Sequence, residues 1–496
     1  MKTPSPFLYD LVHKLSKSEK RYLKVHTYNR EKDYLVLYDA LLAQKHFDEP
    51  GLIAKHKEAN FLKNLAVNKR YLYDLILKSL ANFREKTIDN QVFEKISATN
   101  ILIDKGLYLA AYHELKKGKK LAKKFELFEL QIKLLGIEKQ ILSTQFIKDN
   151  SKNQNQELIF EEEQHCLKQL MNTNEYWYLN QQISKFQMQY QKIQTSQHKK
   201  HMQAIVQSPK FADPELASNI KSKIFYFQAN STYYFMLGDV EMAYQTNKQF
   251  LDFLESKPHF LKLYAERYLA TLNNILIDSF GMDKENILKH GIKRLDLTTQ
   301  KKEFKGVKDL DSRVFRQKHL LLLNWSLRQK NYNKALELIP TIESGLAKYG
   351  NNIEKHHRIT FYYLSAYILF INKRHEQALK WSNLILNEAK EDVVKEIFYF
   401  SRILNLLIHF ELKNFILTDS LVLSIPKYLK ARREIYNSER ALFSFLKKLR
   451  NSVDKKEKKK LIDNFNEELK QLIELPKEKR MFNFLDLRLW LMHIDV

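Results

Sequence analysis

The sequence contains little glycine and proline. There are 10 glycines and 9 prolines among 496 residues, which is well below average usage. Sheet proteins depend on turns, and turns draw heavily on these two residues, so the composition disfavours a β-rich fold. Leu, Lys, Glu, Gln and Ala are abundant instead, and these residues lose little rotamer freedom in a helix. The composition therefore predicts that nearly all of the chain is α-helix.

Cysteine and long apolar runs are also scarce. Cys166 is the single cysteine, so no intramolecular disulfide can form, which is typical of a reducing compartment; we interpret it as a buried structural thiol. The N-terminus carries Asp10 and Lys14 and lacks the apolar stretch of a signal peptide. The uncharged run at 359–372 is too short to span a bilayer. We therefore expect a cytoplasmic protein without a membrane span.

The motifs of common catalytic, nucleotide and metal sites are missing. Phosphate loops need glycines in series, and here the glycines are scattered. There is no H-E-x-x-H and no C-x-x-C, so no zinc signature is present. Glu162 with His165, and Glu354 with His357, have the spacing of di-iron ligands, but the two further glutamates of such a site cannot be assigned. We expect no metal, no cofactor and no enzymatic activity.

What the chain has in excess is positive charge. Its formal net charge is +25, a field that favours an acidic protein, a nucleic acid or an anionic lipid surface as partner. The alternative is that the lysines serve solubility, since they are spread along the whole chain. Charge alone does not separate these two interpretations.

A short turn between two apolar segments organises the chain. The stretch 237–243, with Gly238 and Ala243, lies between aromatic-rich residues 224–236 and a second periodic segment that ends before Pro258. We predict a helix, a tight turn at the glycine and a second helix, which the proline stops. Ala243 is small where the two helices would cross.

The same turn recurs along the chain. Gly106 precedes Ala111 by the same five positions as Gly238 precedes Ala243, and copies without glycine end in Ala335 and Ala378. A weaker copy begins at Lys413. The later copies are roughly 40 to 43 residues apart, and a period of 20–50 residues is the signature of a solenoid.

These turns resemble those of tetratricopeptide (TPR) repeats over residues 93–431. The resemblance implies an all-α, TPR-like α-solenoid of antiparallel helical hairpins, whose stacked units leave a groove that binds peptides or proteins. The period is longer than the usual 34 residues, and the Trp, Tyr and Pro of the strict motif are mostly missing.

The first 90 residues differ from the rest and predict a distinct N-terminal helical domain. Ser16 and Glu19 have the spacing of a capping box, in which each side chain satisfies a free N–H at a helix start. Pro50 is placed to occupy the first turn of a later helix, where no N–H is needed.

Residues 61–76 within this domain resemble a helix-turn-helix. Val67 would close the turn, and Asn68 would cap a recognition helix. The side chains predicted to contact DNA are Asn68, Lys69, Arg70 and Tyr73. The alternative is one core-forming helix whose apolar stripe contains Leu65, Leu72, Leu75, Ile76 and Leu80.

A lysine cluster follows in the helix predicted over 107–125. Lys116, Lys117, Lys120 and Lys124 could track a phosphate backbone, with binding that weakens in salt. A solvated lysine face is the alternative. Neither interpretation fixes a partner.

The predicted domains are 1–90 for the N-terminal helices, 91–445 for the TPR-like repeats and 446–496 for C-terminal capping helices. Our first hypothesis is a non-enzymatic scaffold or adaptor that binds an acidic protein partner through the solenoid groove. The alternative is a nucleic-acid-binding regulator with a helix-turn-helix and a TPR-like sensor array. The sequence predicts no oligomeric state.

Overall fold

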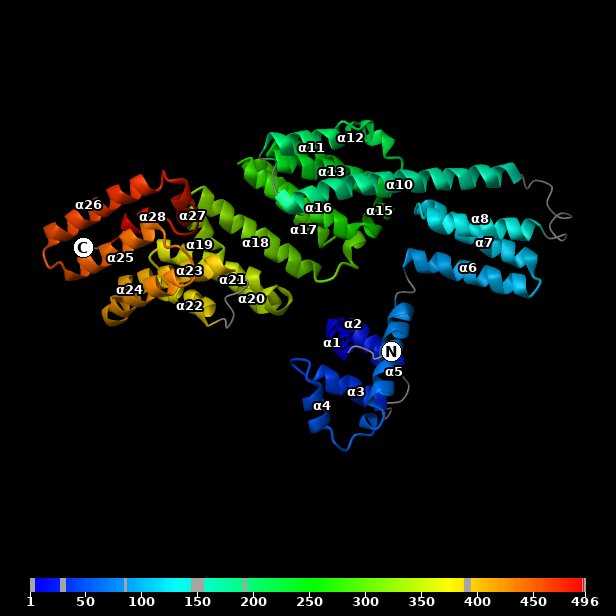
Figure 1. The fold of residues 1–496 in the computed structure, drawn as a ribbon, viewed down its shortest axis with the longest axis horizontal. Coiled ribbons are helices and arrows are strands. Elements are labelled where there is room, and N and C mark those ends of the chain that lie inside the picture. The colour runs from blue at the N-terminus through cyan, green and yellow to red at the C-terminus, as the bar shows by residue number, and fades with distance from the viewer. Residues whose placement is uncertain are drawn as a thin grey trace. The chain divides into compact units, whose positions relative to one another are not determined.

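The computed structural model describes residues 5–26, 33–83, 87–143, 156–190, 193, 195–387, 394–492 and 494. Within these ranges the chain is helical and contains no β-strand, which confirms the all-α prediction. The chain divides into two compact units, one of residues 1–188 and 195–229 and the other of residues 189–194 and 230–496. Figure 1 shows the helices in chain order.

The first helices form a small group with its own core. Their bounds are α1 (Ser5–Lys14), α2 (Lys17–His26), α3 (Asp33–Leu42), α4 (Glu49–Lys55), the 3₁₀ turn η1 (Asn60–Leu62) and α5 (Leu65–Phe83). The core contains Leu8, Leu37, Tyr38, Phe61 and Leu72, all at most 1% exposed.

Both predicted helix starts in this group are confirmed. The Ser16 N–H donates to Glu19 Oε2 at 2.8 Å and the Glu19 N–H donates to Ser16 Oγ at 3.2 Å, which is the reciprocal capping box. Pro50 lies in the first turn of α4, behind the N-cap Asp48.

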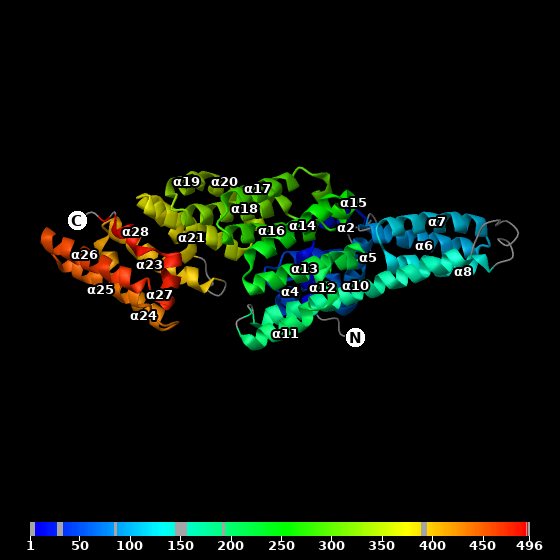
Figure 2. The ribbon, with the colours of Figure 1, turned by 90° about the horizontal axis from the view of Figure 1, so that it is seen from above.

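The rest of the first unit contains longer helices followed by two short ones. Their bounds are α6 (Ile88–Asp104), α7 (Tyr108–Lys124), α8 (Phe128–Leu142), α10 (Gln156–Tyr190), α11 (Ser196–Val206), α12 (Pro209–Ala212) and η2 (Pro214–Leu216). Helix α7 packs against both α6 and α8, and Figure 2 shows the three helices together; Ala111, Leu115 and Leu134 are fully buried in their shared core. Helix α13 (Ile220–Leu237) follows and contains the boundary between the two units.

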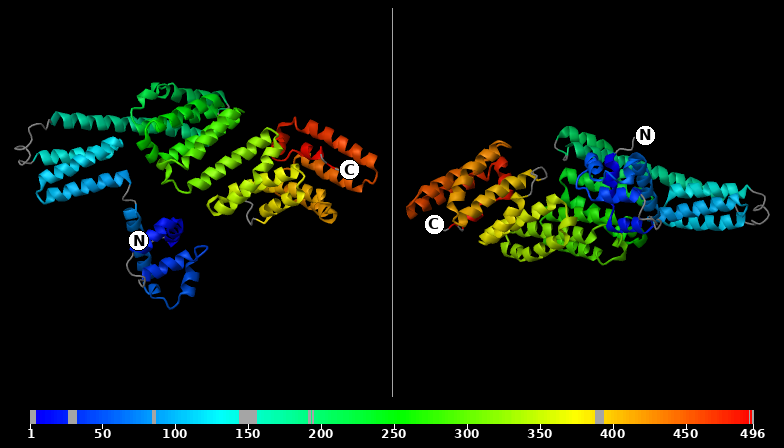
Figure 3. Two further views of the ribbon diagram at one scale, coloured as in Figure 1. Left: turned by 180° about the vertical axis from the view of Figure 1, so that it is seen from behind. Right: turned by 90° about the horizontal axis from the view of Figure 1, so that it is seen from below.

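The second unit continues as a series of hairpins. The bounds are α14 (Val240–Glu255), α15 (Pro258–Leu263), α16 (Ala265–Gly281), α17 (Glu285–Thr298), η3 (Lys302–Phe304), α18 (Leu310–Arg328), α19 (Tyr332–Glu337), α20 (Ile339–Tyr349), η4 (Gly350–Asn352), α21 (Lys355–Ile371), α22 (His375–Leu386), α23 (Lys395–Glu411), α24 (Phe415–Lys430), α25 (Asn437–Asn451), α26 (Lys455–Leu472), α27 (Pro476–Phe484) and α28 (Leu487–Leu491). Figure 3 shows this order from two further sides.

The hairpins of this unit pack on one another in chain order. We call α16, α18, α21 and α23 first helices and α17, α19, α22 and α24 second helices. First helices contact the next first helix, and α17, α19, α22 and α24 each also contact the first helix of the hairpin that follows, which for α24 is α25. Each hairpin therefore buries both of its helices against a neighbour.

One backbone turn recurs between these helices. A residue one or two positions after the end of a helix has a positive φ at Gly106, Glu126, Gly238, Asp283, Lys330, Lys373 and Lys413. At Gly238 the N–H donates to the Phe235 carbonyl at 3.1 Å, and the next N–H, of Asp239, donates to the Tyr234 carbonyl at 3.0 Å. This pair of bonds is the Schellman motif, which satisfies carbonyls that a helix end leaves free.

The position five residues after each turn residue is buried. Its occupants are Ala111, Gln131, Ala243, Leu288, Ala335, Ala378 and Thr418, each at most 5% exposed. The N–H of each one donates to the carbonyl of the residue that precedes the new helix. The predicted turn residues Gly106, Ala111, Gly238, Ala243, Ala335 and Ala378 therefore occupy equivalent places in equivalent turns.

The C-terminal helices share a core with those before them. The predicted boundary at 445/446 falls inside α25, and Leu442 and Leu446, on its two sides, lie in one hydrophobic cluster that runs from Phe315 to Leu491. In the described residues no helix combines the length and the apolar character needed to cross a membrane.

Candidate functional site

A polar groove lies on the first helices α16, α18 and α21 of the second unit, with Leu295 contributed by α17. Its cavity measures about 410 Å³. The lining residues are Leu269, Ala270, Asn273, Leu295, Arg313, Val314, Arg316, Gln317, Leu320, Leu321, Asn324 and His357. Helix α18 contributes most of them, at spacings of three and four, so they share one helix face. We call this cavity the first-helix groove.

Its polar side chains are held in place by neighbours. The Gln317 amide donates to Asn273 Oδ1 across the two helices, and Asn324 Nδ2 donates to the Leu320 carbonyl at 2.7 Å. Arg313 pairs with Glu266 at 2.8 Å and Arg316 pairs with Glu354 at 2.6 Å. These bonds fix the side chains, so the groove offers preset amide and guanidinium groups to a ligand.

His357 closes one side of this groove and is uncharged at neutral pH. Burial lowers the pKa of its imidazole to about 4, and the nearby positive charge of Arg316 acts in the same direction. His357 therefore adds no charge to the groove, and the two arginines that line it are each paired with a glutamate.

Helix α21 also holds the chain's own C-terminal segment. The Tyr363 hydroxyl donates to the Phe484 carbonyl at 2.8 Å, and the Asp486 N–H donates to the Tyr367 hydroxyl at 3.1 Å. The Trp490 indole donates to Glu411 Oε1 of α23 at 2.6 Å. Leu485 and Trp490 are at most 5% exposed, so this segment is part of the core.

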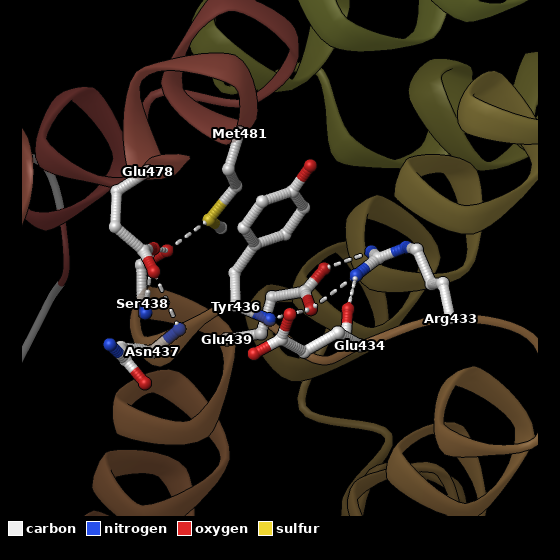
Figure 4. A network of polar contacts seen from close by, with 8 residues as sticks. All are labelled: Arg433, Glu434, Tyr436, Asn437, Ser438, Glu439, Glu478 and Met481. Carbon is white, nitrogen blue, oxygen red and sulfur yellow. Dashed lines mark hydrogen bonds and ion pairs between the residues drawn. The ribbon is translucent and has the colours of Figure 1, made fainter. Parts of the chain in front are cut away.

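A network of polar contacts anchors the same segment to α25 (Figure 4). Glu478 accepts the N–H of Asn437 at 2.8 Å and that of Ser438 at 3.1 Å, so a side chain of α27 caps the first turn of α25. Nearby, Glu439 is fully buried and accepts two bonds from the Arg433 guanidinium. Burial raises the pKa of the Glu439 carboxyl, although Arg433 opposes the shift.

The predicted recognition helix does not begin where expected. Helix α5 starts at Leu65 and continues without a turn, so Asn68 lies inside it and does not cap it. Asn68 Nδ2 donates back to the Phe61 carbonyl at 3.1 Å. Val67 is 66% exposed instead of closing a turn. That detail of the sequence interpretation is wrong, because the helix already begins three residues before the predicted cap.

The remaining residues predicted to contact DNA differ in how deeply they are buried. Lys69 is 6% exposed and its Nζ lies 2.7 Å from Glu49 Oε1. Tyr73 packs against the N-terminal core, and Arg70 is exposed. Leu65, Leu72, Leu75, Ile76 and Leu80 all belong to that core or pack on it, as the alternative interpretation of this helix expected.

The lysines of α7 remain at the surface. Lys116, Lys117, Lys120 and Lys124 are exposed, as is Lys123. Lys117 pairs with Glu114 at 2.6 Å, and the ammonium of Lys116 lies 4.5 Å from the centre of the Tyr112 ring. Lys119, by contrast, points inward to Glu138 and Glu162, at 2.5 and 2.7 Å. The structure thus separates a solvated lysine face from one structural lysine.

The residues considered as metal ligands are otherwise engaged. Glu162 binds Lys119, and Glu354 binds Arg316. Among the described residues no three His, Cys, Asp or Glu side chains gather as a metal site. Cys166 is fully buried, its Sγ lies 3.6 Å from Gln131 Oε1, and burial raises the pKa of the thiol.

Comparison with known proteins gave no match: no family model, no curated protein and no solved structure resembles the chain significantly.

Proposed function

We propose that the second unit is a TPR-like solenoid and that the protein is a non-enzymatic scaffold or adaptor. The observation that carries this proposal is the repeated Schellman turn, followed each time by a buried residue five positions later. From Gly238 to Lys413 successive turns are 40 to 47 residues apart. Hairpins that repeat in this way bury a continuous core and leave a surface along their first helices.

The first-helix groove is the proposed binding site for an acidic, extended protein segment. Carboxamides such as Asn273 and Asn324 can bond to the main chain of a peptide whatever its sequence. Arg313 and Arg316 each bind a glutamate of the chain through Nη1, and their other guanidinium N–H groups would add a preference for carboxylates. The net charge of +25 would steer such a partner toward the protein.

A site-specific photo-crosslinker tests this proposal. It replaces Asn324 in the groove or, as a control, Lys289, which is exposed on the second helix α17. Partner segments that crosslink are identified by mass spectrometry. They are then synthesised as peptides and titrated against the full chain. We expect acidic segments captured only at position 324, whose binding is lost in Ala270→Arg. Capture at both positions, or binding that survives this substitution, contradicts the proposal.

A nucleic-acid partner is the second candidate, and the exposed lysine face of α7 favours it. Phosphate contacts by Lys116, Lys120 and Lys124 would weaken steeply as salt rises. In this alternative the N-terminal helices act as the regulator's DNA-binding part through Arg70, the exposed member of the predicted set.

A salt titration of binding to generic double-stranded DNA and RNA distinguishes these possibilities. The full chain is compared with Arg70→Glu, with a triple Lys→Glu variant at 116, 120 and 124, and with a control triple variant at Lys455, Lys459 and Lys460 of α26. Loss of nucleic-acid binding in the α7 variant alone would place the contact on α7. Loss of binding in Arg70→Glu alone would support the helix-turn-helix interpretation. If all variants weaken binding equally, the net charge of the chain alone accounts for the binding.

A further inference from the structure

A second, apolar groove lies on the opposite helices of two hairpins in the second unit. Its cavity of about 790 Å³ is lined by Leu336, Glu337, Ile339, Pro340, Glu343, Leu346, Ala347, Tyr362, Leu369, Arg374, Gln377, Lys380, Trp381 and Leu384. These residues come from α19, α20 and α22, including Arg374 at the N-cap of α22, with Tyr362 and Leu369 contributed by α21. We call it the second-helix groove. It shares no residue with the first-helix groove.

An interruption in one second helix explains why this groove exists. Helix α19 ends at Glu337 and α20 begins at Ile339, because Pro340 has no N–H to continue the helix. Gly345 then lets α20 lie close to α18: a Cβ at this position would be 2.0 Å from the Phe315 ring. Ile342 of α20 is fully buried. The second helix of this hairpin is thus bent onto α18, and the groove opens between α20 and α22.

The two walls of the groove carry opposite charges. Glu337 and Glu343 lie on the α19–α20 wall, and Arg374 and Lys380 lie on the α22 wall. All four are exposed, and none makes an ion pair with any residue that the structure describes. Leu384 is 47% exposed at the rim. An apolar floor between walls of opposite, uncompensated charge selects for a particular kind of partner.

We propose that the second-helix groove binds an amphipathic helix of a protein partner. Its apolar residues, spaced as i, i+3 or i+4 and i+7, would pack over Tyr362, Trp381 and Leu384. One edge of that helix is basic and faces Glu337 and Glu343, and the other is acidic and faces Arg374 and Lys380. Walls of opposite sign do not suit an anionic lipid surface, which would be repelled by one of them.

The dimensions of the walls fit a helix of about three turns. Helix α20 has 11 residues and α22 has 12, which at 1.5 Å per residue is roughly 17 Å of wall. The proposal stands apart from the proposed function, because it uses other side chains, most of them on the second helices of the hairpins.

Three designed 18-residue helical peptides test this inference. They share one leucine face and differ at its edges: glutamate on one edge with lysine on the other, glutamate on both, or lysine on both. Each is labelled and titrated against the full chain by fluorescence anisotropy. We expect the mixed-edge peptide to bind about tenfold more tightly than either single-sign peptide, as several surface ion pairs together would give.

Variants of the chain sharpen this test. Glu337→Lys with Glu343→Lys makes both walls basic and should transfer the preference to the all-glutamate peptide. Leu384→Asp places a charge on the apolar rim and should weaken the mixed-edge peptide about tenfold or more. Leu423→Asp, at an exposed leucine of α24 outside both grooves, is the matched control and should leave the affinities of all three peptides unchanged.

Several results would overturn the inference. If the all-glutamate peptide already binds best to the unaltered chain, only the net charge is being measured. Binding that ignores Leu384→Asp places the peptide elsewhere, and absence of binding by all three peptides leaves the groove without this role. Circular dichroism confirms that each variant keeps its helix content.

Discussion

At the scale of single residues, the most unusual charge in the second unit is a buried carboxyl. Asp278 on α16 is 4% exposed, and its carboxylate accepts one hydrogen bond, from Asn247 of α14 at 2.9 Å. Burial raises the pKa of this carboxyl from its ordinary value of 3.8 to about 6, against the opposing effect of the Asn247 amide. The folded protein therefore holds this proton more tightly than the unfolded chain does.

The sign of the resulting pH dependence follows from linkage. Between pH 3.8 and about 6 the folded state binds more protons at Asp278, so stability from this group falls as pH rises through that window. Above about pH 6 the cost is constant, at about 2–3 kcal/mol. Asp278→Asn keeps an acceptor for Asn247 and removes the charge, so it should stabilise the protein at pH 7 by about 1–3 kcal/mol.

Urea unfolding of both proteins at pH 4 and pH 7 measures this effect. The variant's advantage should be present at pH 7 and largely absent at pH 4. Asp252→Asn serves as the control because that carboxyl is exposed. An equal advantage at both values would mean that the proton does not matter.

At the scale of secondary-structure elements, the turns allow the stability of glycine and lysine to be compared at positions with positive φ. Lys330, Lys373 and Lys413 adopt positive φ angles of 54° to 59°, a region that costs an L-residue about 1–2 kcal/mol and glycine little. Each Lys→Gly substitution should therefore stabilise by about 0.5–1 kcal/mol, after subtracting the greater chain entropy of glycine. Gly106→Ala and Gly238→Ala should destabilise by a similar amount.

The melting temperature of each variant checks this prediction. Substitution of glycine for Lys380, an exposed residue inside α22, is the control and should destabilise. If Lys→Gly lowers the melting temperature at the turns as well, their lysines make contacts that outweigh the backbone cost.

The sequence could predict these turns only where particular residue types mark them. A glycine followed five positions later by alanine identified the turns at Gly106 and Gly238. The turns at Glu126 and Asp283 were missed, since neither has glycine, and Gln131 and Leu288 replace the alanine. The Schellman hydrogen bonds impose the positive φ there, and they leave no mark in composition.

The site residues were harder to predict because they depend on contacts between distant segments. Lys69 and Asn68 have the residue types of a DNA contact, but Glu49 and the Phe61 carbonyl engage them. Predicting the two grooves requires the rotation of each helix about its own axis. The periodicity of apolar residues fixes that rotation only to within a few positions. The bend at Pro340 depends on Gly345 lying against Phe315, a contact that the sequence alone does not reveal.

The last helices supply a second prediction at this scale. Glu478, 3% exposed, accepts the first N–H groups of α25. Glu478→Ala leaves these N–H groups buried without an acceptor and should destabilise the second unit by about 2–4 kcal/mol. Glu478→Gln retains an acceptor and should cost less. Urea unfolding measures both, with Glu468→Ala, exposed on α26, as a control that should stay within about 0.5 kcal/mol.

At the scale of the whole molecule, the hydrophobic clusters are local in sequence. One contains residues 8–76, and another runs from Phe315 to Leu491. The former lies in the first compact unit and the latter in the second. Chains built from neighbouring helical hairpins lose cooperativity over long distances, so we expect local rather than global responses to damage.

A reciprocal pair of variants tests this expectation by hydrogen exchange. Leu72 is fully buried in the N-terminal cluster, and Leu72→Ala should cost about 2–5 kcal/mol through the cavity it leaves. Faster exchange should then appear in α1–α5 and be absent from α21–α28. Glu478→Ala should produce the opposite pattern. Because exchange reports the opening of each segment separately, acceleration throughout the chain by either variant would show that both clusters unfold as one cooperative unit.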